Sequence, residues 1–265
     1  MKLAFSTLGV PALPIEQVVR LATENGFHGV ELRASDEEPV HPGLSAGERA
    51  DVVEQFGKAG VEILTVAAYA KVAAPGDDQS VLDEIGAAMT LAADLGASYV
   101  RVFPGGGDTE SQEADAVAAR RLAAVAPVAA DLGVRVLLET HDSHRGGADV
   151  ARILGLVGHQ AVGTIWDVMH TWLAGEQPST TYPALAPYLG YVQVKDIASA
   201  ADTTPLALGA GVLPLAETVE VLSRADWDGW LCWEYEKRWY PQVPELAGLL
   251  GPAREHLSRL LADSA

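Results

Sequence analysis

The sequence has little cysteine, few basic residues and no long apolar run, and each shortage excludes a class of protein. Cys232 is the single cysteine among 265 residues, so the chain forms no intrachain disulfide and we expect a cytoplasmic protein. Only 18 Lys and Arg oppose 36 Asp and Glu, which gives a formal net charge of −18. Such an acidic surface repels phosphate backbones, so we expect cations rather than nucleic acid as partners.

No uncharged apolar stretch reaches the roughly 18 residues that a membrane span needs, so we expect no membrane partner. The first residues, M-K-L-A-F-S-T-L-G-V-P, carry one positive charge, as a signal peptide would. Ser6 and Thr7 interrupt their apolar run, however, and no small-residue cleavage site follows. We therefore interpret this segment as a first strand.

Short β-branched or apolar runs alternate with longer Ala- and Leu-rich segments along the whole chain. The eight runs occupy 2–6, 29–33, 62–66, 99–103, 135–139, 163–167, 191–195 and 230–234. Between them apolar residues recur at helical spacing, as at Ile15, Val18, Val19 and Ala22. Repeated β-then-α order predicts a parallel sheet covered by helices, and eight repeats in roughly 250 residues close a barrel. We predict an α/β fold, a single (β/α)₈ TIM barrel domain over residues 1–265.

A doubly wound open sheet is the alternative to a barrel. That fold commonly places a glycine-rich turn after its first strand, where this chain has S-T-L-G-V-P. The segment 171–189 contains Pro178, Pro183 and Pro187, which predicts a short or broken helix there. No linker or low-complexity tract divides the chain, which favours one domain.

Polar residues gather where the last four predicted strands end, namely Glu139, Asp167, Gln193 and Glu234. Catalysis in such barrels takes place at the carboxyl ends of the strands. Alternate strand residues share a face, so the three carboxylates and the amide can converge on the barrel axis. Repulsion and desolvation would raise the carboxylate pKa values unless a cation neutralised them, which predicts a divalent metal. Oxygen ligands with nearby imidazoles favour Mn²⁺ or Mg²⁺, with Co²⁺ or Zn²⁺ as alternatives.

Four segments carry a family resemblance: L-L-E-T-H (137–141), W-D-V-M-H (166–170), V-Q-V-K-D (192–196) and W-E-Y-E-K-R-W (233–239). Together they resemble the sugar phosphate isomerase/epimerase family, in the xylose isomerase-like TIM barrel superfamily with ketose 3-epimerases, hydroxypyruvate isomerase and inosose dehydratase. In that superfamily a Glu, an Asp, a His or Gln and a Glu on the last four strands hold one metal. The resemblance therefore implies Glu139, Asp167, Gln193 and Glu234 as metal ligands, and Glu139 and Glu234 as catalytic residues. Most relatives have His at the position of Gln193. The carbonyl oxygen of Gln is a harder and weaker ligand atom than the nitrogen of His.

Four further residues are candidates for substrate binding: His170, Lys195, His141 and Trp239. The resemblance implies that His170 contacts substrate or supports a ligand. Lys195 shares a face with Gln193 and could contact substrate oxygens, or pair with a carboxylate. His141 is either a substrate contact or a hydrogen-bonded structural histidine, and Trp239 follows the eighth strand, where it could stack on a sugar.

Other readings of these residues stay open at this point. Glu139 and Glu234 could be solvated carboxylates paired with Arg or Lys, and Asp167 could cap a helix. Glu236 could join the site, but we expect it to pair with Lys237 and Arg238. Glu31 and Arg33 share one strand face, where they could line the site or form an ion pair.

The resemblance implies a metal-dependent isomerase or epimerase that acts on a sugar, sugar phosphate or small keto-hydroxy compound by proton transfer through an enediolate. One alternative is metal-dependent dehydration of a keto-inositol, as in inosose dehydratase. Another is a barrel that binds a sugar without turnover. A small sugar-like molecule is the expected partner, and a homodimer is the commonest arrangement if the chain forms an oligomer.

Overall fold

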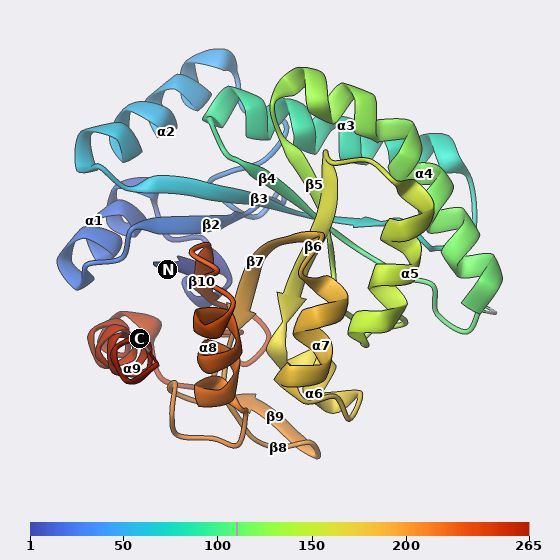
Figure 1. Cartoon of the computed structure of the whole chain (residues 1–265). Helices are drawn as coiled ribbons and strands as arrows, with labels where there is room; N and C mark the ends of the chain where they lie inside the picture. Colours follow the sequence, from blue (N-terminus) through green and yellow to red (C-terminus); the bar gives the residue numbers. More distant parts are fainter. Residues whose placement is uncertain (110, 265) are drawn as a thin grey trace.

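Eight parallel strands close into a barrel in the computed structural model, which describes residues 1–109 and 111–264 (Figure 1). The strands are β1 (Lys2–Ser6), β2 (Gly29–Arg33), β3 (Glu62–Lys71), β4 (Tyr99–Phe103), β5 (Arg135–Glu139), β6 (Val162–Asp167), β7 (Leu189–Val194) and β10 (Trp230–Trp233). They follow one another around the barrel in chain order, and β10 closes on β1 with Leu231 opposite Leu3. The predicted (β/α)₈ TIM barrel is confirmed.

Helices connect the strands and surround the barrel (Figure 1). They are α1 (Ile15–Asn25), α2 (Ala46–Ala59), α3 (Asp78–Leu95), α4 (Ser111–Leu132), α5 (Gly147–Val157), α6 (Val168–Leu173), α7 (Pro178–Leu185), α8 (Leu215–Arg224) and α9 (Leu250–Asp263), with short 3₁₀ turns η1 (Thr7–Gly9) and η2 (Leu246–Gly248). The segment 171–189 holds the end of α6 and the eight-residue α7, so the predicted short or broken helix is confirmed. None of the helices among the described residues is long and apolar enough to cross a membrane.

Apolar side chains fill the lower part of the barrel interior. They form a cluster of their own, made of Ala4, Leu64, Leu137, Ile165, Tyr191, Trp230 and Cys232. Leu137 packs so closely against β7 that a Cβ added at Gly190 would lie 2.4 Å from its Cδ1 atom. Successive side chains of one strand point to opposite faces of the sheet. The residues two positions after Leu137, Ile165, Tyr191 and Cys232 therefore also face the barrel interior. Those residues are Glu139, Asp167, Gln193 and Glu234, which places a polar layer directly above the apolar one.

A two-stranded hairpin follows β7, made of β8 (Ile197–Ser199) and β9 (Asp202–Pro205), and it projects at the lower edge of Figure 1. The sequence patterns did not predict it. The loop after the hairpin is tied to the barrel by Asp196, which is 1% exposed. Its Oδ2 atom accepts bonds of 2.9 Å from the backbone N–H groups of Gly209 and Gly211. Asp196 therefore supports the wall beside the end of β7 and does not pair with Lys195.

Candidate active site

Three carboxylates from three strand ends meet above the apolar layer. Ligand oxygens of Glu139, Asp167 and Glu234 all lie within 4.8 Å of one another. Their side chains are almost fully buried, and so is Gln193 on β7. Of the alternative reading of Glu139 and Glu234, the solvated part is wrong, because the two residues are 1% and 3% exposed. Its other part, pairing with Arg or Lys, is confirmed. Their convergence gives the acidic cluster in which a metal was predicted.

Two buried cations neutralise part of this cluster. Lys195 Nζ lies 2.7 Å from Asp167 Oδ2 and 2.9 Å from Glu236 Oε1, and it also donates a hydrogen bond to Glu234. Arg101, on the inner face of β4, lies 3.1 Å from Glu234 and 3.5 Å from Glu139. Hence the expected pairing of Glu236 with its sequence neighbours is wrong, since its carboxylate turns inward to Lys195. Arg101 is a site residue that the sequence analysis missed.

Several buried polar atoms in the cluster lack a hydrogen-bond partner. They are Glu139 Oε2, Asp167 Oδ2, Gln193 Oε1, Glu31 Oε1 and His170 Nδ1. Asp167 Oδ2 keeps its charge contact with Lys195 and Glu139 Oε2 its long contact with Arg101, but neither contact is a hydrogen bond. Buried polar atoms normally have partners, so several unpartnered acceptors in one place need an explanation. A bound cation would satisfy the free oxygens of Glu139 and Asp167, which belong to one candidate metal group among the described residues, and oxygen atoms of this kind suit a divalent ion.

The amide of Gln193 is oriented by two carboxylates. Its Nε2 atom donates to Glu31 Oε2 at 3.1 Å and to Glu234 Oε1 at 3.2 Å. Glu31 on β2 also accepts a hydrogen bond from the hydroxyl of Tyr191. Arg33 pairs with Glu38 instead. The predicted alternative of an ion pair between Glu31 and Arg33 is therefore wrong. Glu31 lies beneath the site, where it contacts Gln193.

The pKa values of Glu139 and Glu234 are shifted in opposite directions. Burial raises the pKa of Glu139 well above its usual value, and the negative charges of Glu234 and Asp167 add to this although Arg101 and Lys195 oppose it. Burial also acts on Glu234, but Lys195 and Arg101 together outweigh it and lower the pKa of that carboxyl. Environments that separate the pKa values of two neighbouring carboxyls are typical of acid–base pairs.

Two histidines lie beside the carboxylates, with ring centroids 4.1 Å apart. His170, on α6, is 8% exposed, and burial, with the nearby His141 and Lys195, lowers its pKa well below the usual value. His141 follows β5 and is only half-buried, with Nδ1 3.3 Å from Asp142 Oδ2. Atoms of these two rings and of Glu139 also lie within 4.8 Å of one another, which makes a second group that could hold a metal.

A cavity of about 300 Å³ opens above the cluster. Its lining includes Arg101, Glu139, His141, His170, Glu234 and Trp239. Of the other predicted site residues, Asp167, Gln193 and Lys195 lie below the cavity wall and not along it. Trp239 is 52% exposed at the rim, with Arg33 Cζ 5.5 Å from its ring centroid. A small polar molecule in the cavity would contact the two glutamates directly.

Asp167 caps α6, as one of its two sequence readings proposed, and the ligand reading stays a prediction. Its Oδ1 atom accepts a bond of 2.8 Å from Met169 N–H and one of 3.3 Å from His170 N–H, which caps α6. Its other oxygen faces the carboxylate cluster and Lys195. One side chain therefore begins a helix and contributes an oxygen to the candidate metal site.

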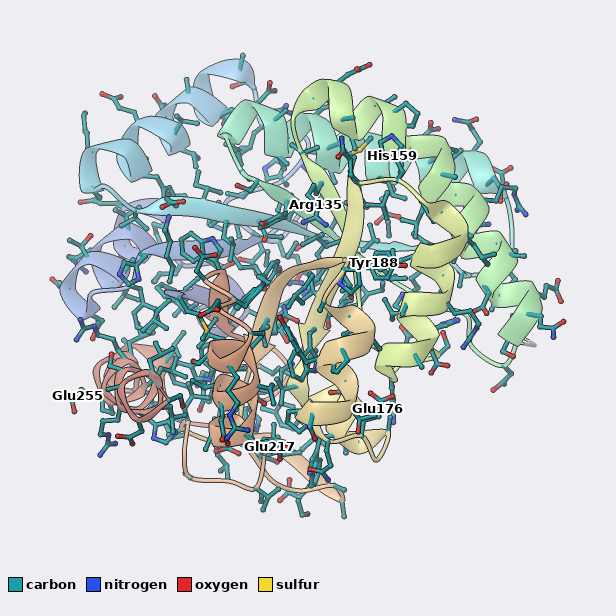
Figure 2. All side chains as sticks on the ribbon, viewed as in Figure 1. Arg135, His159, Glu176, Tyr188, Glu217 and Glu255 are labelled. Atoms are coloured by element: carbon teal, nitrogen blue, oxygen red, sulfur yellow. The ribbon has the colours of Figure 1, made fainter. Side chains whose placement is uncertain are left out.

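A separate depression lies at the opposite end of the barrel, where the side chains of Arg135, His159 and Tyr188 are labelled in Figure 2. Arg135 donates to the carbonyl oxygens of Gln160 and Tyr188, both at 3.1 Å. His159 Nδ1 accepts the N–H of Ala161. These groups serve the backbone, so the strand-end cluster is the stronger candidate for chemistry.

Comparisons with known proteins agree with this architecture. The family model of the xylose isomerase-like TIM barrel matches residues 19–260. A 3-dehydroshikimate dehydratase of Bacillus anthracis is 24% identical over 187 residues, which cover 69% of this chain and 66% of that protein. The match thus spans just under two thirds of that relative's length.

Solved structures share the fold over the full chain. An IolI protein with a bound zinc atom superposes with a TM-score of 0.84 at 17% identity, covering 100% of this chain and 99% of that one. A D-tagatose 3-epimerase-like protein superposes with a TM-score of 0.83 at 19% identity, covering 100% and 98%. The TM-scores establish the common barrel. The sequence identities are too low to transfer a reaction, which must be argued from the site.

Proposed function

Because the chain belongs to the xylose isomerase-like TIM barrel family, we propose that it is a metal-dependent enzyme of the sugar isomerase/epimerase kind. It would move a proton at a carbon next to a carbonyl group, through an enediolate. The observation that carries this proposal is the meeting of Glu139, Asp167 and Glu234 within 4.8 Å beneath a cavity of sugar-ring size.

Glu139, Asp167, Gln193 and Glu234 would hold the metal. Among the described residues, Glu139 Oε2, Asp167 Oδ2 and Gln193 Oε1 accept no hydrogen bond, and these three free acceptors support the ligand set. Glu234 completes it by position, because one of its carboxylate oxygens lies within 4.8 Å of those of Glu139 and Asp167. When bound, a divalent cation acts as a Lewis acid that polarises a carbonyl and orients an adjacent hydroxyl. The oxygen-rich set favours Mn²⁺ or Mg²⁺, while the imidazoles of His141 and His170 keep Zn²⁺ and Co²⁺ as alternatives.

The two glutamates would divide the proton transfer. Lys195 and Arg101 lower the pKa of Glu234, so this carboxylate is prepared to remove a proton. Glu139 has a raised pKa and is prepared to carry one. If the two act on opposite faces of one carbon, the product is an epimer. If one carboxylate returns the proton to the neighbouring carbon, the product is an isomer.

Three further groups would stabilise the oxygens of the substrate. Arg101 lines the cavity, whereas Lys195 lies beneath it and would act through its charge alone. Both are buried cations, and fixed charges in a water-poor site stabilise developing negative charge strongly. His170 has a depressed pKa and is therefore neutral near pH 7, which allows its ring to donate or accept one hydrogen bond. Trp239 at the rim would cover the bound molecule.

Dehydration of a cyclic keto compound is the second candidate. The similarity to a 3-dehydroshikimate dehydratase favours it. It would begin with the same proton removal, but a hydroxyl on the next carbon would then leave as water. His141 lies beside Glu139, with its ring centroid 4.1 Å from that of His170, and it offers a group that could protonate that hydroxyl. Loss of water lowers the mass of the substrate, whereas isomerisation and epimerisation do not.

The test is proton exchange in D₂O. Purified protein is stripped with a chelator and reloaded with Mn²⁺, Mg²⁺, Co²⁺ or Zn²⁺. Deuterium uptake by ketoses, 2-keto acids and keto-inositols is then followed by NMR and mass spectrometry. We expect metal-dependent exchange that falls about 100-fold or more in Glu139→Gln and in Glu234→Gln, in line with the usual share of acid–base groups. Glu255→Gln on α9, labelled in Figure 2 and exposed, is the matched control.

Full exchange in both glutamine variants would reject the proposed proton transfer. A protein that binds a sugar tightly but catalyses no exchange with any metal would favour the binding-only barrel. Folding of each variant is checked by circular dichroism, so that lost exchange is not confused with lost structure.

A further inference from the structure

The catalytic cavity adjoins a second, larger one. This second cavity, of about 650 Å³, lies among the loop that follows β2, the end of β3, helix α3 and the chain after β10. Tyr69 and Trp239 line both cavities. We call the larger one the Trp239 groove. The two cavities therefore adjoin at the rings of Tyr69 and Trp239.

Tyr69 is held from both sides of that wall. Arg33, which lines the groove, donates from Nε to the Tyr69 hydroxyl at 2.5 Å, and its Cζ lies 5.2 Å from the ring centroid. Arg101, which lines the catalytic cavity, has its own Cζ 5.2 Å from the same ring. The phenol is therefore held between one cation of each cavity, at the place where the two cavities adjoin.

The groove combines flat apolar surface with polar edges. Its apolar lining is Ala34, Pro42, Ala68, Ala88 and the ring of Trp239. Ser35 also lines it, and its buried Oγ atom has no hydrogen-bond partner. Asp36 and Glu84 add carboxylates, both from exposed residues. A sugar ring needs this mixture, because its C–H faces pack on aromatic rings while its hydroxyls need donors and acceptors.

The charges of the groove argue against an anionic group. Arg33 is paired with the buried Glu38, and Arg238 is paired with Glu37. Both guanidinium groups that line the groove are thus neutralised by a carboxylate of the same loop. With Asp36 and Glu84 also present, the described lining residues offer no surplus positive charge for a phosphate.

The catalytic cavity is smaller than the Trp239 groove. A volume of about 300 Å³ is at the lower end for a ligand site, and about 650 Å³ is in the middle of the range. The reacting part of the substrate would then be the smaller part.

We propose that the Trp239 groove is a second substrate subsite, and that the substrate is a neutral two-ring compound. One ring or open chain carries the reacting keto and hydroxyl groups and lies against Glu139 and Glu234. A second sugar ring, joined to the first by a glycosidic bond, lies on Trp239. This inference rests on the proposed function, since the reacting part is placed in the proposed catalytic cavity.

The test compares ketoses with and without a second ring. The metal-loaded protein is assayed for deuterium exchange with D-fructose, fructose 6-phosphate, lactulose and isomaltulose, the last two being neutral ketose disaccharides. We expect kcat/KM for at least one disaccharide to exceed that for fructose about tenfold or more, and fructose 6-phosphate to gain nothing. Equal or lower values for both disaccharides, or a preference for the phosphate, would overturn the inference.

A matched pair of variants on α3 locates the effect. Glu84→Trp adds an indole to the groove lining, whereas Ala87→Trp adds the same side chain to an exposed position of α3 outside it. We expect Glu84→Trp to raise KM for the disaccharide about tenfold more than Ala87→Trp does. Its effect on fructose should be much smaller. Equal effects of the two variants on the disaccharide would place the second ring elsewhere.

Different results would reject the second subsite and the proposed function. If no sugar exchanges protons with any metal, the proposed function fails, and the groove is then judged by binding alone. Lactulose binding is measured by saturation-transfer NMR in the wild type, Glu84→Trp and Ala87→Trp. Binding that is lost only in Glu84→Trp supports the subsite. No binding in the wild type, or equal binding in all three proteins, overturns it.

Discussion

Gln193 Nε2 donates a hydrogen bond of 3.1 Å to Glu31 Oε2, which joins β7 to β2 across the floor of the site. Both side chains are fully buried. Since the amide nitrogen is committed to Glu31 and Glu234, the amide oxygen is left without a donor. Glu31 therefore determines which atom of Gln193 is available to a cation.

Replacing Glu31 by Gln should weaken metal binding. A neutral amide at this position no longer requires the nitrogen of Gln193 to face it, so the Gln193 oxygen loses its fixed direction. Outer residues that orient a ligand typically contribute 10–100-fold in metal affinity, and we expect a rise in Kd for Mn²⁺ of about that size. Calorimetric titration of chelator-treated protein measures it, with Glu255→Gln as the control. Unchanged affinity would mean that Glu31 does not act on the metal through Gln193.

Replacing Gln193 by His should change which metal the protein prefers. Imidazole is a softer ligand than an amide oxygen and suits Zn²⁺ and Co²⁺ better than Mg²⁺ or Mn²⁺. After equilibration with equal concentrations of the four ions, elemental analysis should find a larger share of Zn²⁺ and Co²⁺ in Gln193→His than in the wild type. The same metal distribution in both proteins would argue that Gln193 is not a ligand.

Replacing Lys195 by Met should destabilise the metal-free protein. Lys195 is 3% exposed and faces Asp167, Glu234 and Glu236, which would be left without their main counter-charge. Breaking a buried ion pair costs several kcal/mol, so we expect the free energy of unfolding to fall by about 3 kcal/mol in urea with EDTA present. Added Mn²⁺ should recover part of the loss, because a cation replaces the missing charge.

Lys58→Met is the control for this experiment. Lys58 forms an exposed ion pair with Glu54 on α2, and exposed pairs contribute little. Equal urea midpoints for the two variants would show that Lys195 is not a structural counter-charge of the cluster.

His170 should make the stability of the metal-free protein fall as the pH falls below about 6.5. Burial, with His141 and Lys195 nearby, lowers the pKa of His170 well below that value in the folded state. The unfolded chain then takes up a proton that the folded protein resists, so acid favours unfolding. Between pH 7.5 and pH 5, His170→Gln should lose less unfolding free energy than the wild type, as measured by urea denaturation. An equal loss would mean that His170 is protonated in the folded protein.

The barrel and the inward carboxylates could be predicted from the sequence because both follow from strand periodicity. In β5, for instance, Leu137 faces the apolar layer, and Glu139 two residues later faces the polar one. The same spacing relates Cys232 to Glu234. A buried strand that ends in an acid on its inward face is a local pattern, and it needs no knowledge of the other strands.

Pairing of Lys195 with a carboxylate was one of its two sequence readings, but the partners of Lys195 and the role of Arg101 could not be predicted in this way. Arg101 lies at the centre of the apolar run Y-V-R-V-F, and that isolated charge was the available signal, but its partners are more than 35 residues away in the chain. Glu236 was expected to pair with Lys237 and Arg238, but the chain turns after Glu236 and those two cations pair with Glu245 and Glu37. The partner of Glu236, Lys195, is on another strand end, and only the closed barrel brings the two together.

Asp167 divides its two oxygens between the start of α6 and the carboxylate cluster, so an ion bound by that cluster would couple its own affinity to the order of α6. Whatever tightens one must tighten the other by the same factor. If the cluster holds the proposed ion, removing it with a chelator would loosen the turn that carries His170 and leave Lys195 and Arg101 as the counter-charges of the carboxylates.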